Sequence, residues 1–209
     1  LRHLLDGDAV RARLLVLNAA EEGTPVRDLY VNVLQWAQHE VGRRWQANQI
    51  SVAQEHLATA VTRQVMGGLT ALAVPSESSG RTVVISCVAT EQHDVGARMV
   101  ADFFEMEGWR TYYLGADLPT PEILESVKRY RADVLGLSAT LTPHLKLVRE
   151  IITALRSTPE TASVQVIVGG YPFNIDPDIW QQLGADGCAS SAETAVRIAE
   201  DLVEVETRD

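Results

Sequence analysis

The chain has 209 residues, which is enough for one large domain or two small ones with a sizeable core. Hydrophobic residues make up 46% of it and charged residues 22%, as in ordinary globular proteins. The formal net charge of -10 argues against a broad nucleic-acid interface, because phosphate binding requires clustered Lys and Arg. No apolar run approaches the roughly 20 residues of a membrane span, and no signal peptide pattern is visible. We therefore expect a cytoplasmic protein that contacts neither nucleic acid nor membrane.

Residues 1–74 show helical periodicity throughout. Ser51-Val52-Ala53-Gln54 has the form of a capping box and predicts the start of the last helix in this region. With the end of an earlier helix at Leu1–Leu5, three long segments predict a four-helix-bundle cap domain over residues 1–74. The long helices are expected over residues 8–22, 25–44 and 51–72. The second of them is expected to bury one side, made of Leu29, Val33, Leu34, Trp36, Ala37 and Val41.

Pro75–Gly80 (PSESSG) is a polar linker and predicts a domain boundary. Over residues 81–209, strand-like and helix-like segments alternate five times. This alternation predicts an α/β domain with a doubly wound, parallel, five-stranded sheet of the Rossmann-like or flavodoxin-like kind. The expected strands are Thr82–Ala89, Arg110–Gly115, Asp133–Ala139, Val164–Val168 and Gly187–Ser190. The expected helices are Gly96–Glu107, Thr120–Tyr130, Pro143–Arg156, Asp176–Leu183 and Ala192–Val205. Cys87 and Cys188 fall in expected strands, so we expect buried thiols rather than a disulfide.

The hexapeptide Glu91–Gly96 (EQHDVG) directly follows the first expected strand. Loops at the carboxyl edge of such a sheet are where these folds bind ligands. A carboxylate two residues before His93 can hold one ring nitrogen and leave the other free for a metal. A phosphoacceptor receiver domain is disfavoured because the third strand ends Ser138-Ala139-Thr140, without an acid. A flavin site is disfavoured because residues 90–96 contain one hydroxyl and one glycine.

Three motifs in order resemble those of the cobalamin-binding domain family over residues 80–205: Glu91-x-His93-x-x-Gly96, Ser138-x-Thr140 and Gly169-Gly170. The resemblance implies that His93 is the lower axial ligand of cobalt, in place of the cofactor's own benzimidazole. It also implies that Glu91 orients the imidazole, at a place where the family more often has Asp. The other cofactor contacts that it implies come from Asp94, Val95, Gly96, Ser138, Thr140, Gly169 and Gly170.

A second resemblance lies in the helical region, where Trp45 is followed ten positions on by Glu55-His56. Trp-x9-Glu-His resembles the cap signature of the cobalamin-dependent photoreceptors, the CarH-like light sensors. The resemblance implies bound adenosylcobalamin with the Trp45 indole over its upper axial group and Glu55 and His56 beside it. Gln46 departs from the light-sensing repressors, which have a histidine there that binds cobalt after illumination. His56, His39 or water would then take that position.

The sequence therefore leads us to expect a light sensor rather than an enzyme, holding adenosylcobalamin base-off with His93 on cobalt. Photolysis of the Co–C bond would move the cap and change a homo-oligomer or the contacts with an unidentified output protein. A bilin as second chromophore stays open, as does a missing N-terminal domain, since the repressors carry a helix-turn-helix domain. The alternative is a corrinoid methyl-carrier protein of a methyltransferase system, which would have the same two-part layout. The small subunit of an adenosylcobalamin mutase fits less well, because those subunits generally lack a helical cap.

Overall fold

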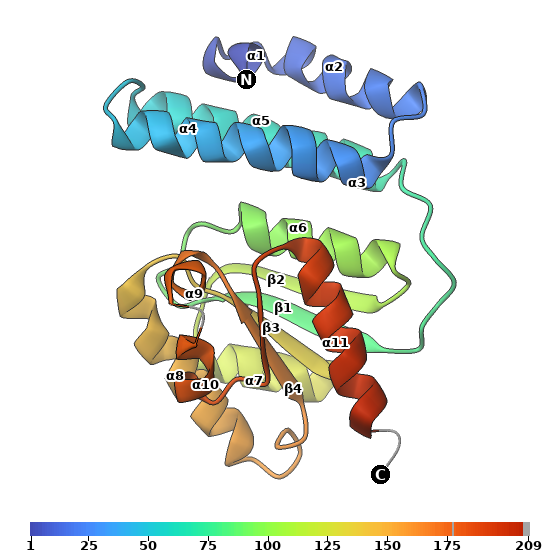
Figure 1. Ribbon diagram of the computed structural model, residues 1–209, viewed down its shortest axis with the longest axis vertical. Helices are drawn as coiled ribbons and strands as arrows, with labels where there is room; N and C mark the ends of the chain where they lie inside the picture. Colours follow the sequence, from blue (N-terminus) through green and yellow to red (C-terminus); the bar gives the residue numbers. More distant parts are fainter. Residues whose placement is uncertain (177, 207–209) are drawn as a thin grey trace. The chain divides into compact units, whose positions relative to one another are not determined.

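The structure is a computed structural model that describes residues 1–176 and 178–206. The chain divides into two compact units, Leu1–Val74 and Pro75–Asp209 (Figure 1). Residue 177, inside the expected helix at 176–183, and residues 207–209 of the expected second domain lie outside the described residues. In the part of the chain that the structure describes, no helix is long and apolar enough to cross a membrane.

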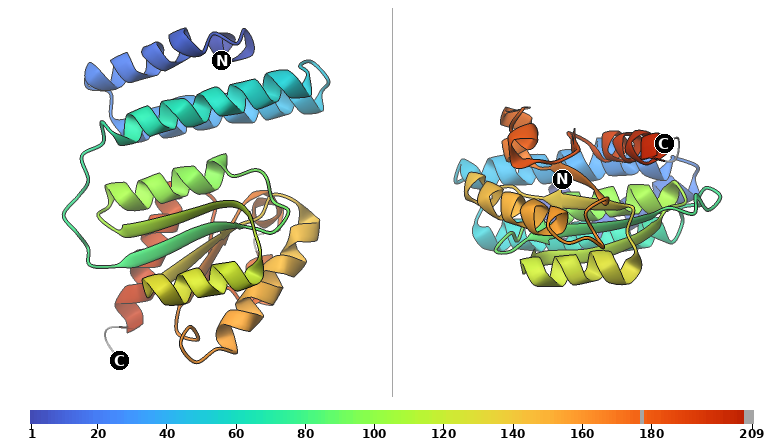
Figure 2. Two further views of the ribbon diagram at one scale, coloured as in Figure 1. Left: turned by 180° about the vertical axis from the view of Figure 1, so that it is seen from behind. Right: turned by 90° about the horizontal axis from the view of Figure 1, so that it is seen from below.

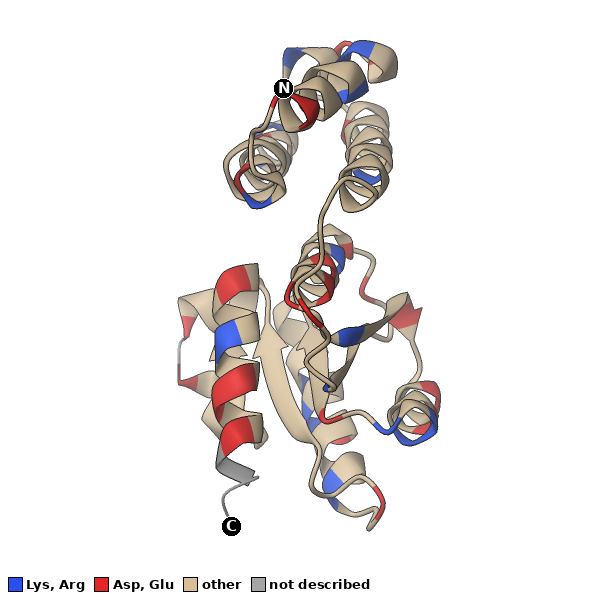
Figure 3. Cartoon of the chain, turned by 90° about the vertical axis from the view of Figure 1, so that its right-hand side faces the viewer, with Lys and Arg blue, Asp and Glu red and all other residues tan. Residues whose placement is uncertain are grey.

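The first unit is made of helices that pack side by side. Its elements are α1 (Arg2–Leu5), α2 (Ala9–Glu21), α3 (Val26–Asp28), the π-helix η1 (Leu29–Gln35), α4 (Trp36–Gln46) and α5 (Val52–Thr70). Seen end-on, α2, α4 and α5 form a triangle (Figure 3). The capping box is confirmed, because Ser51 Oγ accepts from the Gln54 N–H at 3.2 Å and Gln54 Oε1 accepts from the Ser51 N–H at 3.0 Å. The predicted helical cap region is thus confirmed, with α1 contributing a single turn.

The expected helix at 25–44 is interrupted by seven residues of π-helix, and its predicted buried side is partly wrong. Val33 is 38% exposed and Trp36 is 56% exposed. Tyr30, which the pattern left out, is fully buried, and its hydroxyl donates to the Met66 carbonyl at 3.2 Å. A π-helix advances by a different angle per residue from an α-helix, so a face drawn at 3.6 residues per turn does not follow the real one.

The second unit contains one parallel sheet with the strand order β2-β1-β3-β4-β5, which confirms the predicted doubly wound fold. Its strands are β1 (Thr82–Val88), β2 (Arg110–Leu118), β3 (Val134–Ser138), β4 (Gln165–Gly169) and β5 (Gly187–Ala189). Its helices are α6 (Val95–Met106), α7 (Thr120–Tyr130), the 3-10 turn η2 (Thr142–His144), α8 (Leu145–Arg156), α9 (Tyr171–Ile175), α10 (Ile179–Leu183) and α11 (Ala192–Glu206). The expected helix at 176–183 is α10 alone, and α9 was not predicted.

The sheet is buried between two helical layers. All seven residues of β1 are buried, as expected for a central parallel strand with both faces covered. Helices α6 and α11 lie on one face, and α7 and α8 on the other (Figure 2). This arrangement leaves the strand ends open to solvent, and the edge strand β2 is only half-buried along most of its length. The carboxyl ends of β1, β3 and β4 lie side by side, since Cys87 pairs in register with Ser138 and Ser138 with Gly169.

Gly170 ends the β4 side of this edge in a conformation that favours glycine, with φ at 116°. A Cβ atom there would lie 2.1 Å from the carbonyl oxygen of Ala139, which is a backbone atom and cannot move aside cheaply. We expect Gly170→Ala to lower the free energy of unfolding by about 3 kcal/mol. The matched control is Gly96→Ala, where nothing lies within 4 Å of the added carbon and the residue is helical; it should be neutral or stabilising by up to ~1 kcal/mol. Chemical denaturation would measure both, and equal stability of the two variants would contradict the prediction.

Candidate functional site

The loop after β1 has a strained backbone that the neighbouring strand holds in place. Thr90 has φ at 64° and Asp117, at the end of β2, has φ at 56°. The Thr90 N–H donates to Asp117 Oδ1 at 2.7 Å, and the Asp117 N–H donates to the Glu91 carbonyl at 3.0 Å. Such conformations cost on the order of 1–3 kcal/mol and persist when the surrounding contacts over-determine them. The direction in which Glu91 leaves the sheet is therefore fixed by β2.

The Glu91 carboxylate is fully buried and accepts four hydrogen bonds. Its Oε1 accepts from the His93 backbone N–H at 2.8 Å and from His93 Nδ1 at 2.7 Å. Its Oε2 accepts from the Thr140 N–H at 2.5 Å and from His144 Nδ1 at 3.0 Å. Burial by itself would raise the pKa of Glu91, but the hydrogen bonds outweigh it and hold that pKa below its ordinary value. Glu91 is thus an anion that ties β1, β3 and two imidazoles together.

His93 has one ring nitrogen engaged and the other available. Because the carboxylate can only accept, Nδ1 carries the proton, and the lone pair of the ring lies on Nε2. The side chain of His93 is 61% exposed, and Nε2 has no hydrogen-bond partner among the described residues. A neutral imidazole fixed through Nδ1 by a carboxylate is the arrangement in which histidine binds metals. One such nitrogen fits an axial position on a metal whose other ligands belong to a prosthetic group.

His144 is the site residue that the sequence analysis missed. It ends η2 after β3, is 6% exposed, and its Nε2 lies 3.1 Å from Thr90 Oγ1. With Nδ1–H donating to Glu91, Nε2 accepts from the Thr90 hydroxyl, so a chain of hydrogen bonds runs Thr90–His144–Glu91–His93. A signal was present, because Pro143-His144 follows the third strand and therefore lies at the same sheet edge. A buried carboxylate also needs donors on both of its oxygens.

The other expected residues of the second unit gather at the same edge. Ser138 and Gly169 are paired neighbours on β3 and β4, and Thr140 contributes its backbone N–H to Glu91. Asp94 accepts from the Tyr113 hydroxyl at 2.9 Å, which holds the start of α6 against β2. Val95 and Gly96 form the first turn of α6, and the space above Gly96 is open to 4 Å. The edge therefore carries no side chain at Gly96 and Gly169.

A pocket of about 390 Å³ lies at the ends of β4 and β5, beside this edge. Cys188 lies half-buried in the wall of this pocket, and its burial raises the pKa of its thiol. Both Cys87 and Cys188 are free thiols, as predicted. None of the lining residues was predicted from the sequence, because the pocket exists only once α9 and α10 are folded over the sheet end. Its lining is Phe173, Asn174, Trp180, Cys188 and Ser190.

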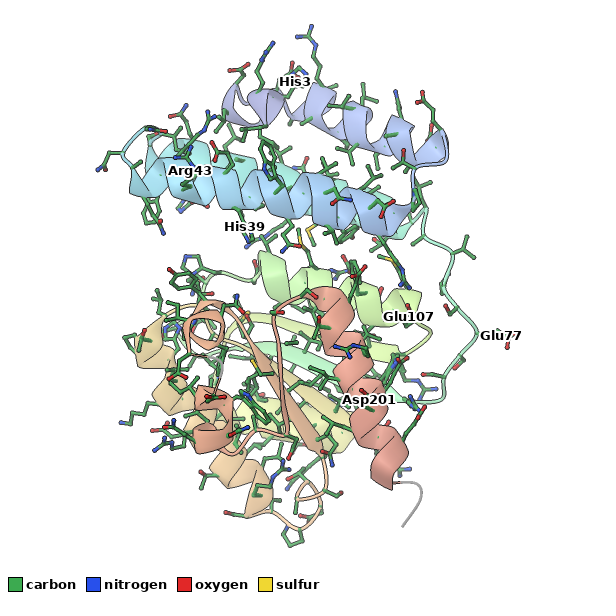
Figure 4. The ribbon with its side chains drawn as sticks, viewed as in Figure 1. His3, His39, Arg43, Glu77, Glu107 and Asp201 are labelled. Atoms are coloured by element: carbon green, nitrogen blue, oxygen red, sulfur yellow. The ribbon has the colours of Figure 1, made fainter. Side chains whose placement is uncertain are left out.

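The expected cap residues belong to the first unit. Trp45 is 42% exposed near the end of α4, and Gln46 is the exposed last residue of that helix. Glu55 accepts from Thr59 Oγ1 at 2.8 Å, and its other oxygen lies 3.5 Å from His56 Nε2. Figure 4 shows His39 on the side of α4 that faces away from α2. Each of these residues thus lies on the surface of its own helix or is bonded within it.

The Glu91 network predicts a pH-dependent effect of Glu91→Gln. A glutamine side chain has an NH2 group in place of one carboxylate oxygen, so it cannot accept the hydrogen bonds that the second oxygen of Glu91 accepts. We therefore expect the free energy of unfolding to fall by about 2 kcal/mol at pH 7. The folded-state pKa of Glu91 is lowered, so its contribution is complete above the unfolded pKa and is lost as the pH falls through the folded one. The difference between wild type and variant should therefore shrink below about pH 4. Chemical denaturation at several pH values measures it, with exposed Glu125→Gln as the control; a difference that does not change with pH would rule the network out.

Comparison with known proteins identifies relatives over both units. Residues 81–200 match a family described as "B12 binding domain", and residues 1–70 match a second one with the same description. Dimethylamine corrinoid protein 3 of Methanosarcina mazei is 28% identical over 168 residues, which are 79% of this chain and 99% of that protein. Dimethylamine corrinoid protein 1 of Methanosarcina acetivorans is 32% identical over 130 residues, which are 61% of this chain but only 60% of that protein.

Solved structures share the fold at lower identity. The monomethylamine corrinoid protein of Methanosarcina barkeri superposes with a TM-score of 0.81 at 22% identity, over 98% of this chain and 95% of that one. A chain of the methanol:cobalamin methyltransferase complex of the same organism gives a TM-score of 0.55 at 19% identity, over 97% of this chain and 77% of that one. These likenesses show that the fold, helical region included, is that of cobalamin-binding proteins.

The light-sensor interpretation of Trp45 and Glu55-His56 is wrong. The two relatives described above carry the name of dimethylamine corrinoid proteins, not of photoreceptors, and one of them matches 79% of this chain. Adenosylcobalamin, the bilin and light-dependent assembly were implied by the same resemblance and lose their support with it. The cobalamin-binding resemblance carried by the motifs around Glu91, Ser138 and Gly169 is confirmed at the level of the family. Since the match of residues 81–200 covers more than half of the chain, the protein belongs to the B12 binding domain family.

Proposed function

We propose that the chain is a corrinoid methyl carrier: a binding module that holds a cobalamin and moves a methyl group between separate methyltransferases. The observation that carries this proposal is that a dimethylamine corrinoid protein matches it over 99% of that relative's length, helical region and sheet together. In this reading the chain is not itself the enzyme. Its partners are one methyltransferase that transfers the methyl group from a substrate to the bound cobalamin and a second that transfers it from the cobalamin to an acceptor.

The sheet unit supplies a binding edge suited to a corrinoid. His93 Nε2 would bind the cobalt in place of the cofactor's own base, and Glu91 would orient the ring and place the proton of the neutral imidazole on Nδ1. The bound corrinoid supplies a cobalt centre that accepts a methyl group from one substrate and releases it to another. The exposure of the His93 ring fits this role, since its free nitrogen has to be within reach of a cofactor that arrives from solution.

The displaced nucleotide tail of the cofactor would lie along the strand ends. Ser138 and Thr140 offer hydroxyls there, and Gly169-Gly170 brings the backbone close, because Gly170 approaches Ala139 more tightly than any side chain would allow. The pocket beside β5 has aromatic walls in Phe173 and Trp180 and polar groups in Asn174 and Ser190, which suit a nucleotide. We propose that it takes the end of the tail.

The helical unit would cover the upper face of the corrinoid. Trp45, Glu55 and His56 remain the residues that we propose for this contact, now around a methyl group rather than an adenosyl group. The hydrogen bond from the Thr59 hydroxyl to Glu55 limits the motion of the Glu55 carboxylate. Trp45 is exposed, so its side chain can move without loss of core packing.

The proposal is tested with the purified chain and methylcobalamin carrying an isotope-labelled methyl group, in the dark and without oxygen. We expect stoichiometric binding with the spectrum of a base-off cofactor. The reduced holoprotein should then take up one methyl per cobalt from methyl iodide and release it to a small thiol. His93→Ala should lower cobalamin affinity by at least tenfold, because the axial nitrogen is lost. His3→Ala, at a histidine of α1 that has no part in the proposed contacts, is the control, and it should retain the spectrum of the wild type.

Two results would sink the proposal. One is a chain that binds no cobalamin although denaturation shows it folded. The other is a holoprotein whose bound cobalt takes up no methyl group under conditions in which free cobalamin does.

A further inference from the structure

We propose that the outward face of α2 binds the same face of α2 in a second copy of the chain. The two helices would lie antiparallel about a two-fold axis and form a weak dimer. This inference rests on the first unit alone and is independent of the proposed function.

The face is apolar at its centre and has no cover. Helix α2 buries only Ala12 and Val16 against the rest of its unit. On the opposite side, Val10 is 59% exposed, Leu14 48% and Leu15 64%. Val10 and Leu14 are one turn apart on one edge of this side, and Leu15, about 100° further round the helix, lies on its other edge, one turn after Arg11. Figure 1 shows α2 lying along α5 with its other side free.

The charges on α2 are separated along the helix. Arg11 and Arg13 lie in its first half, Glu21 and Glu22 close its end, and no charged residue lies between them. Among the described residues, Arg13, Glu21 and Glu22 form no ion pair, and the bond from Arg11 to Asp8 is at the surface at 3.2 Å. An isolated helix is destabilised by this order, because its dipole already places positive charge at the start and negative charge at the end.

An antiparallel partner turns the same charge order into attraction. The arginine end of one α2 then lies against the glutamate end of the other, and so do the opposite ends of the two helix dipoles. With the two-fold axis between residues 16 and 17, Arg11 faces Glu22 of the second copy and Leu15 faces Asn18. The two Leu15 residues then lie about 4.5 Å apart along the helix direction, close to the axis. Such self-complementarity is what a two-fold interface requires. A basic or an acidic partner protein would satisfy only one end of the helix.

The area fits a weak and reversible dimer. A helix of 13 residues is about 20 Å long, so one helix pair buries less than the roughly 800 Å² per partner of a standard interface. We expect a dissociation constant on the order of micromolar or weaker.

Analytical ultracentrifugation of the full chain over a concentration series tests the proposal by charge swapping. Leu15→Glu should raise the dissociation constant at least tenfold, and so should the pair Glu21→Arg/Glu22→Arg. Adding Arg11→Glu/Arg13→Glu to that pair should restore the dimer, because both ends are then reversed together. Val74→Glu, at an exposed apolar position outside α2, is the control and should leave the dissociation constant unchanged.

Circular dichroism of each variant separates loss of the dimer from loss of the helix. A wild-type chain that stays monomeric up to millimolar concentration would overturn the proposal. So would a dimer that survives Leu15→Glu, or a fourfold charge swap that fails to restore association while the helix content is unchanged.

Discussion

The site depends on one buried anion. Four donors surround the Glu91 carboxylate, and they come from the loop after β1, from the backbone after β3 and from η2. A buried charge is tolerated only when its hydrogen bonds are complete, so the loss of any one donor would affect the others. The strained Thr90 and Asp117 hold the loop from the side of β2. The position of His93 is therefore set by three strands at once, although it lies on an exposed loop.

This constraint explains how an exposed histidine can be a precise ligand. An imidazole on a free loop would lose rotamer freedom when it bound a metal. Here Nδ1 is held by Glu91 before any cofactor arrives. Glu91 is held by His144, and the Thr90 hydroxyl holds His144 in turn. The longer Glu, where the family more often has Asp, is accommodated because His144 and the Thr140 N–H occupy its second oxygen. The rigid site suits the proposed role of a carrier whose cofactor is presented to partner proteins.

The sequence was sufficient for those features whose signal is local. Alternating strands and helices predicted the parallel sheet, the His93 loop was placed at its carboxyl edge, and Ser51 with Gln54 predicted the start of α5. His144 was missed because its contact with Glu91 joins residues more than fifty positions apart, which no local pattern reveals. Val33 and Trp36 were misplaced because a π-helix alters the periodicity that the pattern assumes. The light-sensor interpretation was wrong because it rested on three residues, Trp45, Glu55 and His56. So short a motif does not distinguish between functions, whereas relatives that match most of the chain do.

The central claim is that His93, oriented by Glu91, is the axial ligand of the bound cobalamin. Electron paramagnetic resonance of the cobalt(II) form tests it directly, because an axial nitrogen splits the cobalt lines according to its nuclear spin. Protein uniformly labelled with nitrogen-15, loaded with unlabelled cobalamin, should show two-line splitting in place of the three-line splitting of unlabelled protein. Three-line splitting in the labelled protein would mean that the cofactor's own base is still bound, and it would contradict the account.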